Sequence, residues 1–168
     1  MDLPATHRIG FGYDVHRFLR GRRLVLGGVR IPYPLGLEGH SDADVVLHAI
    51  CDAILGAAAL GDIGQHFPNT SRRYKNISSL KLLEAVARLI GKGGMQVVNV
   101  DATIVLEEPK LLPYVPSMRR RIARSLGIRP SFVSVKATTS EGLGFAGRRE
   151  GCAAFAVALI ATTGTTKG

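Results

Sequence analysis

The sequence contains no tryptophan and only two cysteines among its 168 residues. The cysteines, Cys51 and Cys152, lie in apolar surroundings far apart in the chain, and neither belongs to a C-x-x-C pair. This placement argues against a thiolate zinc site and against a disulfide framework. We therefore expect two buried free thiols.

Long hydrophobic runs are also missing. No apolar run reaches the ~18 residues that a membrane span requires. The N-terminal stretch MDLPATHRIG lacks the basic start and apolar core of a secretory signal. We expect a single soluble domain over residues 1–168, with no membrane partner and a cytoplasmic location.

Acidic residues are few, with 13 Asp and Glu against 22 Lys and Arg and a net charge of +9. Such an excess raises nucleic acid as a partner, and a basic binding module would be retained on DNA or RNA in a salt-sensitive manner. However, the basic residues are scattered, and aromatic stacking platforms are missing among them. A polyanionic small molecule explains part of the basicity equally well, so we expect no nucleic-acid partner.

Hydrophobic periodicity predicts an α+β fold. Strand patterns cover residues 7–18, 23–27, 29–32, 98–106 and 132–137, and helical patterns cover residues 41–60, 78–90 and 116–126. The apolar run 151–162 fits a strand or a buried helix, and we favour a strand because the sheet needs a partner. The prediction is a two-layer sandwich in which helices cover one face of a mixed sheet of four or more strands.

Local signals define two further features. The helix at 41–60 is expected to start at a capping box formed by Ser41 and Asp44 and to stop at Gly61. The cluster at 32–36 is expected to be a turn. Residues 61–76 are rich in Gly, Pro and Asn, and an irregular loop of this length in a small domain is more often functional than idle.

Three polar residues have the chemistry of a metal site. Asp14 and His16 are two apart in a predicted strand, so their side chains point to the same face. His48 projects about 200° away from the apolar stripe of its predicted helix, so it does not fill the core. Asp44 and Asp52 lie four residues before and after His48, and one of them is expected to accept its second N–H and fix its tautomer.

One carboxylate and two imidazoles leave a fourth tetrahedral position open for water or substrate, as in catalytic sites. Zn²⁺ suits this set best, with Mn²⁺ or Co²⁺ as substitutes. Two alternatives stand beside it. The three residues could be separately satisfied polar groups, or the same site could serve a zinc-dependent phosphohydrolase.

The segment GLGFAG, residues 142–147, matches G-x-G-x-x-G but precedes a strand-like run, so we reject dinucleotide binding. Before it, Thr138, Thr139, Ser140 and Glu141 end a predicted strand. Their hydroxyls and the glycine N–H groups could bind phosphate, and the carboxylate could hold Mg²⁺. Such turns are common, so the motif alone is weak.

Four stretches together resemble the 2-C-methyl-D-erythritol 2,4-cyclodiphosphate synthase family: RIGFGYDVHRF, LGGVRIPYPLGLEGHSDADVVLHAICDAILGAAALGDIGQHFP, PKLLP and VKATTSEGLGFAGRREG. The resemblance implies a homotrimer with active sites between subunits, each holding one Zn²⁺ and using Mg²⁺ or Mn²⁺ with the substrate diphosphate. The implied substrate is the CDP derivative of methylerythritol 2-phosphate. Its 2-phosphate attacks the β-phosphorus, CMP leaves, and a cyclic diphosphate forms.

Carried over by position, the resemblance makes Asp14, His16 and His48 the zinc ligands. It makes His40 and Thr139 the groups that stabilise the transition state, and Glu141 the Mg²⁺ ligand. The substrate-binding positions that it implies are Asp14, Val15, His16, His40, Ser41, Asp62, Ile63, Gly64, Phe67, Pro68, Asn69, Thr70, Ser71, Leu106, Pro109, Lys110, Leu111, Leu112, Thr138, Thr139, Ser140, Glu141, Phe145 and Arg148.

Within that set, residues 62–64 match the stretch that contacts the methylerythritol hydroxyls, and residues 106–112 match a cytidine pocket offered by the adjacent subunit. The chain also departs from the family pattern. Glu107 and Glu108 add two charges beside the cytidine segment. Phe155 stands where members that bind an isoprenoid phosphate in the central channel tend to carry an acid, so we do not expect that ligand here.

Overall fold

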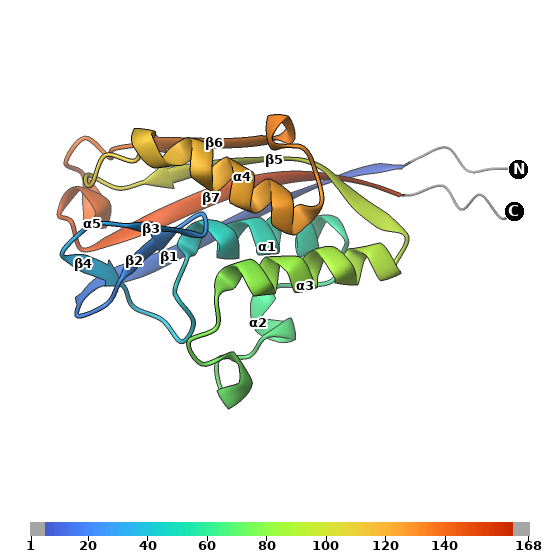
Figure 1. Ribbon diagram of the computed structural model, residues 1–168, viewed down its shortest axis with the longest axis horizontal. Coiled ribbons are helices and arrows are strands. Elements are labelled where there is room, and N and C mark those ends of the chain that lie inside the picture. Colours follow the sequence, from blue (N-terminus) through green and yellow to red (C-terminus); the bar gives the residue numbers. More distant parts are fainter. Residues whose placement is uncertain (1–5, 163–168) are drawn as a thin grey trace, which may run out of the picture.

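The computed structural model describes residues 6–162 (Figure 1). Its main sheet is built from β1 (His7–Arg20), β4 (Leu35–Leu37), β5 (Met95–Val105), β6 (Val133–Thr138) and β7 (Gly151–Thr162). The strand order is β4-β1-β7-β5-β6, in which β5 and β6 are parallel and the other neighbours are antiparallel. The predicted mixed sheet is confirmed, and the final apolar run is a strand.

Three long helices, α1 (Val45–Ala57), α3 (Ser79–Lys92) and α4 (Val115–Leu126), lie on one side of the sheet (Figure 1). The shorter elements are α2 (Ile63–His66), α5 (Gly144–Gly147), the 3-10 turns Arg72–Tyr74, Leu112–Tyr114 and Pro130–Phe132, and a hairpin of β2 (Leu24–Leu26) and β3 (Val29–Ile31). Within the described part of the chain, no helix is long and apolar enough to cross a membrane. Both cysteines are buried and free, as predicted.

Two local predictions were wrong. The first helix begins at Val45 instead of residue 41, because Asp44 is itself the N-cap and its carboxylate accepts the N–H of Leu47 at 3.2 Å. Ala43, with a φ of 54°, turns the chain just before it, so Ser41 starts no capping box. The expected turn at 32–36 overlaps β4, which is short and edge-lying because only its three residues pair with the end of β1.

Helix α1 packs directly against β1, and glycine makes this approach possible. A Cβ at Gly12 would lie 2.0 Å from the carbonyl oxygen of Ala49, and one at Gly10 would lie 1.9 Å from that of Ala53. Only hydrogen at these positions lets the helix backbone meet the strand. The contact holds His48, near the start of α1, over the face of β1 on which Asp14 and His16 lie.

The opposite face of the sheet carries exposed apolar side chains. Because strand residues alternate, Gly10 and Gly12 face α1 while Ile9 and Phe11 point away from it, and these two are 73% and 63% exposed. On the neighbouring strand β7, Val157 lies opposite Phe11. Contiguous exposed apolar patches mark interaction surfaces.

Candidate metal centre and substrate pockets

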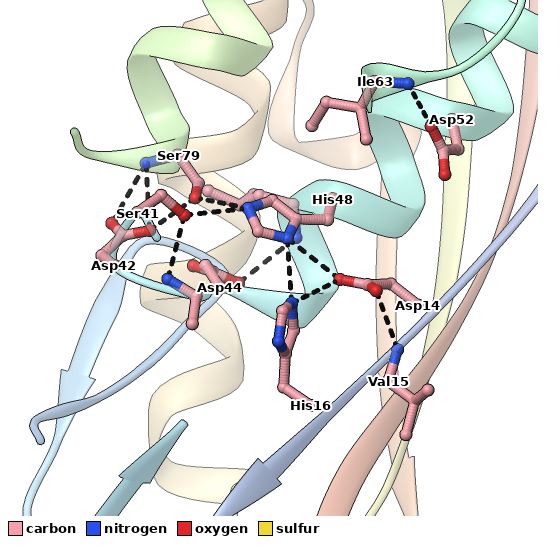
Figure 2. Close-up of polar contacts among 12 residues, drawn as sticks. Asp14, Val15, His16, Ser41, Asp42, Asp44, His48, Asp52, Ile63 and Ser79 are labelled. Carbon is pink, nitrogen blue, oxygen red and sulfur yellow. Dashed lines mark hydrogen bonds and ion pairs between the residues drawn. The ribbon is translucent and has the colours of Figure 1, made fainter. Parts of the chain in front are cut away.

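Asp14, His16 and His48 converge at one point between β1 and α1 (Figure 2). Oδ2 of Asp14 lies 3.0 Å from Nε2 of His16 and 2.9 Å from Nδ1 of His48, and the two imidazole nitrogens are 3.3 Å apart. Ligand atoms of a tetrahedral Zn²⁺ with bonds of about 2.0–2.1 Å lie roughly 3.3 Å from one another. The donor set and its spacing therefore fit one divalent cation.

The electrostatics of the triad favour an ionised carboxylate. Burial raises the pKa of Asp14, but the neighbouring imidazoles of His16 and His48 outweigh it and lower this pKa to about 2. Burial also lowers the pKa of His16, but the hydrogen bond with Asp14 outweighs that effect and raises it. The carboxylate thus carries its negative charge at neutral pH, where it can attract a cation.

The prediction that Asp44 or Asp52 accepts an N–H of His48 is wrong. Both carboxylates bind backbone N–H groups instead. Asp44 accepts from Gly27 at 2.9 Å and Gly28 at 2.6 Å in addition to its own helix, and Asp52 accepts from Ile63 at 2.7 Å. A helical spacing of four places side chains on one surface, but here the hairpin turn and the loop after α1 supply nearer partners.

Two serines take the place of these acids beside His48. Nε2 of His48 lies 3.0 Å from Oγ of Ser79 and 3.2 Å from Oγ of Ser41. Ser79 is the first residue of α3 and is fully buried. Nothing in its spacing signals this role, because it lies 31 residues from His48 and the helix that carries it must first be docked.

A pocket of about 400 Å³ opens beside the triad. Its lining includes His16, His48, His40, Ser41, Ile63, Gly64, Phe67, Pro68, Asn69 and Thr70, which brings most of the predicted methylerythritol-side residues together with the two histidines of the triad, while Asp14 is not in the lining. The ring of His40 is held at its Nε2 by the carbonyl of Ser71, at 3.1 Å. Asp62 does not line this pocket, because its carboxylate caps α2 through the N–H of Gln65.

A second pocket, of about 470 Å³, gathers the predicted cytidine residues. Its lining includes Leu106, Pro109, Lys110, Leu111, Leu112, Thr138 and Thr139, and it adds Glu107, Val115, Val135, Lys136 and Ala137. Thr139 donates its hydroxyl proton to Glu141 at 2.9 Å. None of the lining residues of the first pocket recurs here, so the two pockets are separate within one chain.

The remaining predicted residues are not in the lining of either pocket. Phe145 and Val15 line a third cavity of about 690 Å³. Arg148 is paired with Glu150, its Nε lying 2.9 Å from Oε1. Ser140 is bound by Glu107, whose Oε1 accepts its N–H at 2.9 Å and its hydroxyl at 3.0 Å.

The fold and the triad together define an α+β protein with a candidate divalent-metal site that opens into a pocket. The model of the YgbB family matches residues 7–161, and the chain belongs to that family. A 2-C-methyl-D-erythritol 2,4-cyclodiphosphate synthase from Syntrophomonas wolfei is 63% identical over 153 residues, which cover 91% of this chain and 98% of the relative. The synthase from Chlorobium luteolum is 64% identical over 155 residues, covering 92% and 99%. The protein is thus an enzyme of this lyase family.

Solved structures show the same fold. The bifunctional IspDF from Campylobacter jejuni has a TM-score of 0.94 and 38% identity and covers 99% of this chain, while the chain spans only 45% of that protein. A CDP complex of IspF from Plasmodium falciparum has a TM-score of 0.81 and 34% identity, covering 93% of this chain and 96% of the other. That relative therefore binds CDP in a chain of the same architecture.

Proposed function

We propose that the protein converts 4-CDP-2-C-methyl-D-erythritol 2-phosphate to 2-C-methyl-D-erythritol 2,4-cyclodiphosphate and releases CMP. The substrate's 2-phosphate oxygen forms a bond to the β-phosphorus, and the bond from that phosphorus to the CMP oxygen breaks. The observation that carries the proposal is the His₂Asp triad, two of whose members, His16 and His48, line a pocket that His40 and Ser41 also line. The identity of 58–64% to synthases of this name supports it.

Asp14, His16 and His48 would hold Zn²⁺, since their donor atoms match its preferred ligands and spacing. When bound there, the ion supplies Lewis acidity toward a phosphate oxygen of the substrate. Side chains of the protein bind and orient the substrate. The carbonyl of Ser71 accepts from Nε2–H of His40 and so holds this ring at the pocket wall, where it can bind the substrate phosphate.

The second pocket contributes the cytidine side. Its lining includes the predicted residues Leu106, Pro109, Lys110, Leu111, Leu112, Thr138 and Thr139, and we infer that it takes the base and ribose. Thr139 would stabilise the charge that develops on the β-phosphate, and Glu141 would hold a Mg²⁺ or Mn²⁺ ion against the diphosphate. The hydrogen bond between these two side chains keeps them together before substrate arrives.

We also propose that three copies of the chain assemble so that the second pocket of one subunit completes the first pocket of its neighbour. Two observations support association between copies of the chain, and the number three comes from the family resemblance. The two pockets share no lining residue within one chain. The face of the sheet away from the helices is apolar and exposed, with Ile9, Phe11 and Val157 on it, as a subunit interface requires.

Product analysis tests the proposed reaction. The protein is incubated with the CDP-linked substrate, Zn²⁺ and Mg²⁺, and the products are identified by mass spectrometry. We expect CMP and the cyclic diphosphate in equal amounts. Release of inorganic phosphate instead of a ring would show a phosphohydrolase, and absence of CMP would refute the proposal.

Two variants on the same strand separate the site from the scaffold. His16→Ala removes one triad member and is expected to abolish bound zinc and CMP release while the chain stays folded. His7→Ala, at the exposed start of β1, is expected to leave both unchanged. Full turnover by a zinc-free His16→Ala protein would contradict the assignment of the triad.

A further inference from the structure

A carboxylate, a hydroxyl and an imidazole form a continuous chain beside the metal triad (Figure 2). Oγ of Ser79 lies 3.0 Å from Nε2 of His48 and 2.5 Å from Oδ1 of Asp42. The carboxylate of Asp42 also accepts the backbone N–H of Ser79, at 3.1 and 3.0 Å from its two oxygens. This series of hydrogen bonds begins at Asp42 in the loop before α1, passes through Ser79, the first residue of α3, and ends on His48, a candidate metal ligand.

The direction of each hydrogen bond follows from the protons available. An ionised carboxylate only accepts, and a serine hydroxyl has one proton to donate. Oxygens 2.5 Å apart must have that proton between them, so Ser79 donates to Asp42. Oγ of Ser79 can then only accept from His48, which means that Nε2 of His48 carries a proton. The lone pair of Nδ1 is left facing Asp14 and His16. In the metal-free protein, Nε2–H of His16 can donate both to Oδ2 of Asp14, 3.0 Å away, and to this lone pair, 3.3 Å away.

The opposite tautomer would form an equally good local contact. With its proton on Nδ1, His48 could donate to Oδ2 of Asp14, 2.9 Å away. That form has no lone pair at Nδ1 to give to a cation. The hydrogen bonds of Asp42 and Ser79 oppose it, because a Nε2 without a proton would face a serine oxygen that has none left to donate.

We propose that Asp42 and Ser79 are positioning residues that hold His48 in the Nε2–H tautomer and so keep Nδ1 available to a divalent cation. The inference rests on the proposed metal-dependent function and deepens it. Neither residue belongs to the triad. Each acts through His48, as the groups behind a metal-bound histidine do when they fix its tautomer and ring orientation.

Ser41 limits the size of the expected effect. Its Oγ lies 3.2 Å from Nε2 of His48 and accepts the N–H of Ala43 at 3.1 Å. Its second lone pair can accept Nε2–H, although its own hydroxyl proton can also donate to an unprotonated Nε2 once the hydroxyl of Ser79 is removed. Loss of Ser79 should weaken cation binding without abolishing it.

Asp42 and Ser79 also dock α3, and the test must separate this role from the proposed one. Ser79→Ala keeps the backbone N–H that Asp42 accepts, so α3 stays docked. It removes only the hydroxyl, so the hydrogen bond to His48 is lost. Ser78→Ala is the matched control, because Ser78 is the N-cap of α3 but its side chain makes no capping hydrogen bond. Ser79→Thr restores a hydroxyl at the same position.

The first measurement is the affinity of the full chain for Zn²⁺ alone, by competition with a chromophoric chelator. We expect Ser79→Ala to bind Zn²⁺ about 10- to 100-fold more weakly, the range found when groups behind a metal ligand are removed. Ser78→Ala should match the wild-type protein, and Ser79→Thr should recover most of the loss. Wild-type affinity in Ser79→Ala would overturn the inference.

The second measurement needs no metal. Long-range ¹H–¹⁵N NMR on the metal-free protein at a pH of about 9, where imidazoles are neutral, locates the proton of His48. We expect Nε2–H in the wild-type protein and a substantial share of Nδ1–H in Ser79→Ala. An unchanged tautomer overturns the inference whatever the zinc affinity. If the wild-type protein binds no Zn²⁺, the proposed function fails, and the NMR result still decides the role of Ser79.

Discussion

A single methyl group on β1 should separate the two halves of the metal site. In Gly12→Ala the new Cβ would lie 2.0 Å from the carbonyl oxygen of Ala49, whereas ordinary contact begins at 3.4 Å, so α1 must retreat by about 1.4 Å. His48 moves with α1 while Asp14 stays on β1. Their ligand atoms, now 2.9 Å apart, would then be about 4.3 Å apart. This exceeds twice a zinc bond, about 4.2 Å, so one ion could no longer bind both.

The assay combines zinc competition with circular dichroism and thermal unfolding. Gly12→Ala is expected to lose zinc binding, or to fail to fold if the helix cannot retreat. Gly56→Ala makes the same change on the exposed side of α1, where the nearest atom would be 4.0 Å away. Removing a helical glycine there should stabilise the protein by about 0.5–1 kcal/mol. Wild-type zinc affinity and melting in Gly12→Ala would refute the reasoning about this contact.

Three further outcomes are expected. In the metal-free protein, the lowered pKa of Asp14 stabilises the fold above pH 3.8, and this stabilisation is lost as the pH falls toward about 2. The raised pKa of His16 stabilises the fold below pH 6.5, and this stabilisation is lost as the pH rises through the raised pKa. The melting temperature of His16→Ala should therefore fall furthest below wild type between those values, and a constant difference across pH would count against the pair. Phe11→Asp should yield monomers in sedimentation with an unchanged far-UV spectrum, whereas a persistent trimer would exclude this face as the interface. Asp44→Ala leaves three backbone N–H groups without an acceptor and should lower the free energy of unfolding in urea by about 3 kcal/mol or more. Asp62→Ala, at the exposed N-cap of α2, should lower it less, and equal effects would contradict this ranking.

Where periodicity carried the prediction, the structure agrees. The alternation of β1 places Asp14 and His16 on one face, and the apolar spacing within residues 41–60 predicts a helix with His48 off its buried stripe, which the structure shows as α1. Cap and partner predictions were less successful. The N-cap of α1 is Asp44 rather than Ser41, since the cap depends on backbone dihedrals such as the positive φ of Ala43, which no pattern of residue types specifies.

The sequence alone indicated Asp14, His16 and His48 as candidate metal ligands and predicted which way their side chains point, because these directions follow from the short repeats of strand and helix. Only the tertiary structure decided which of them meet. Gly10 and Gly12 let α1 approach β1 until His48 reaches Asp14, and the docking of α3 brings Ser79 to the far nitrogen of His48. Such contacts join residues more than thirty positions apart, so they depend on how whole elements pack, which a local pattern does not contain.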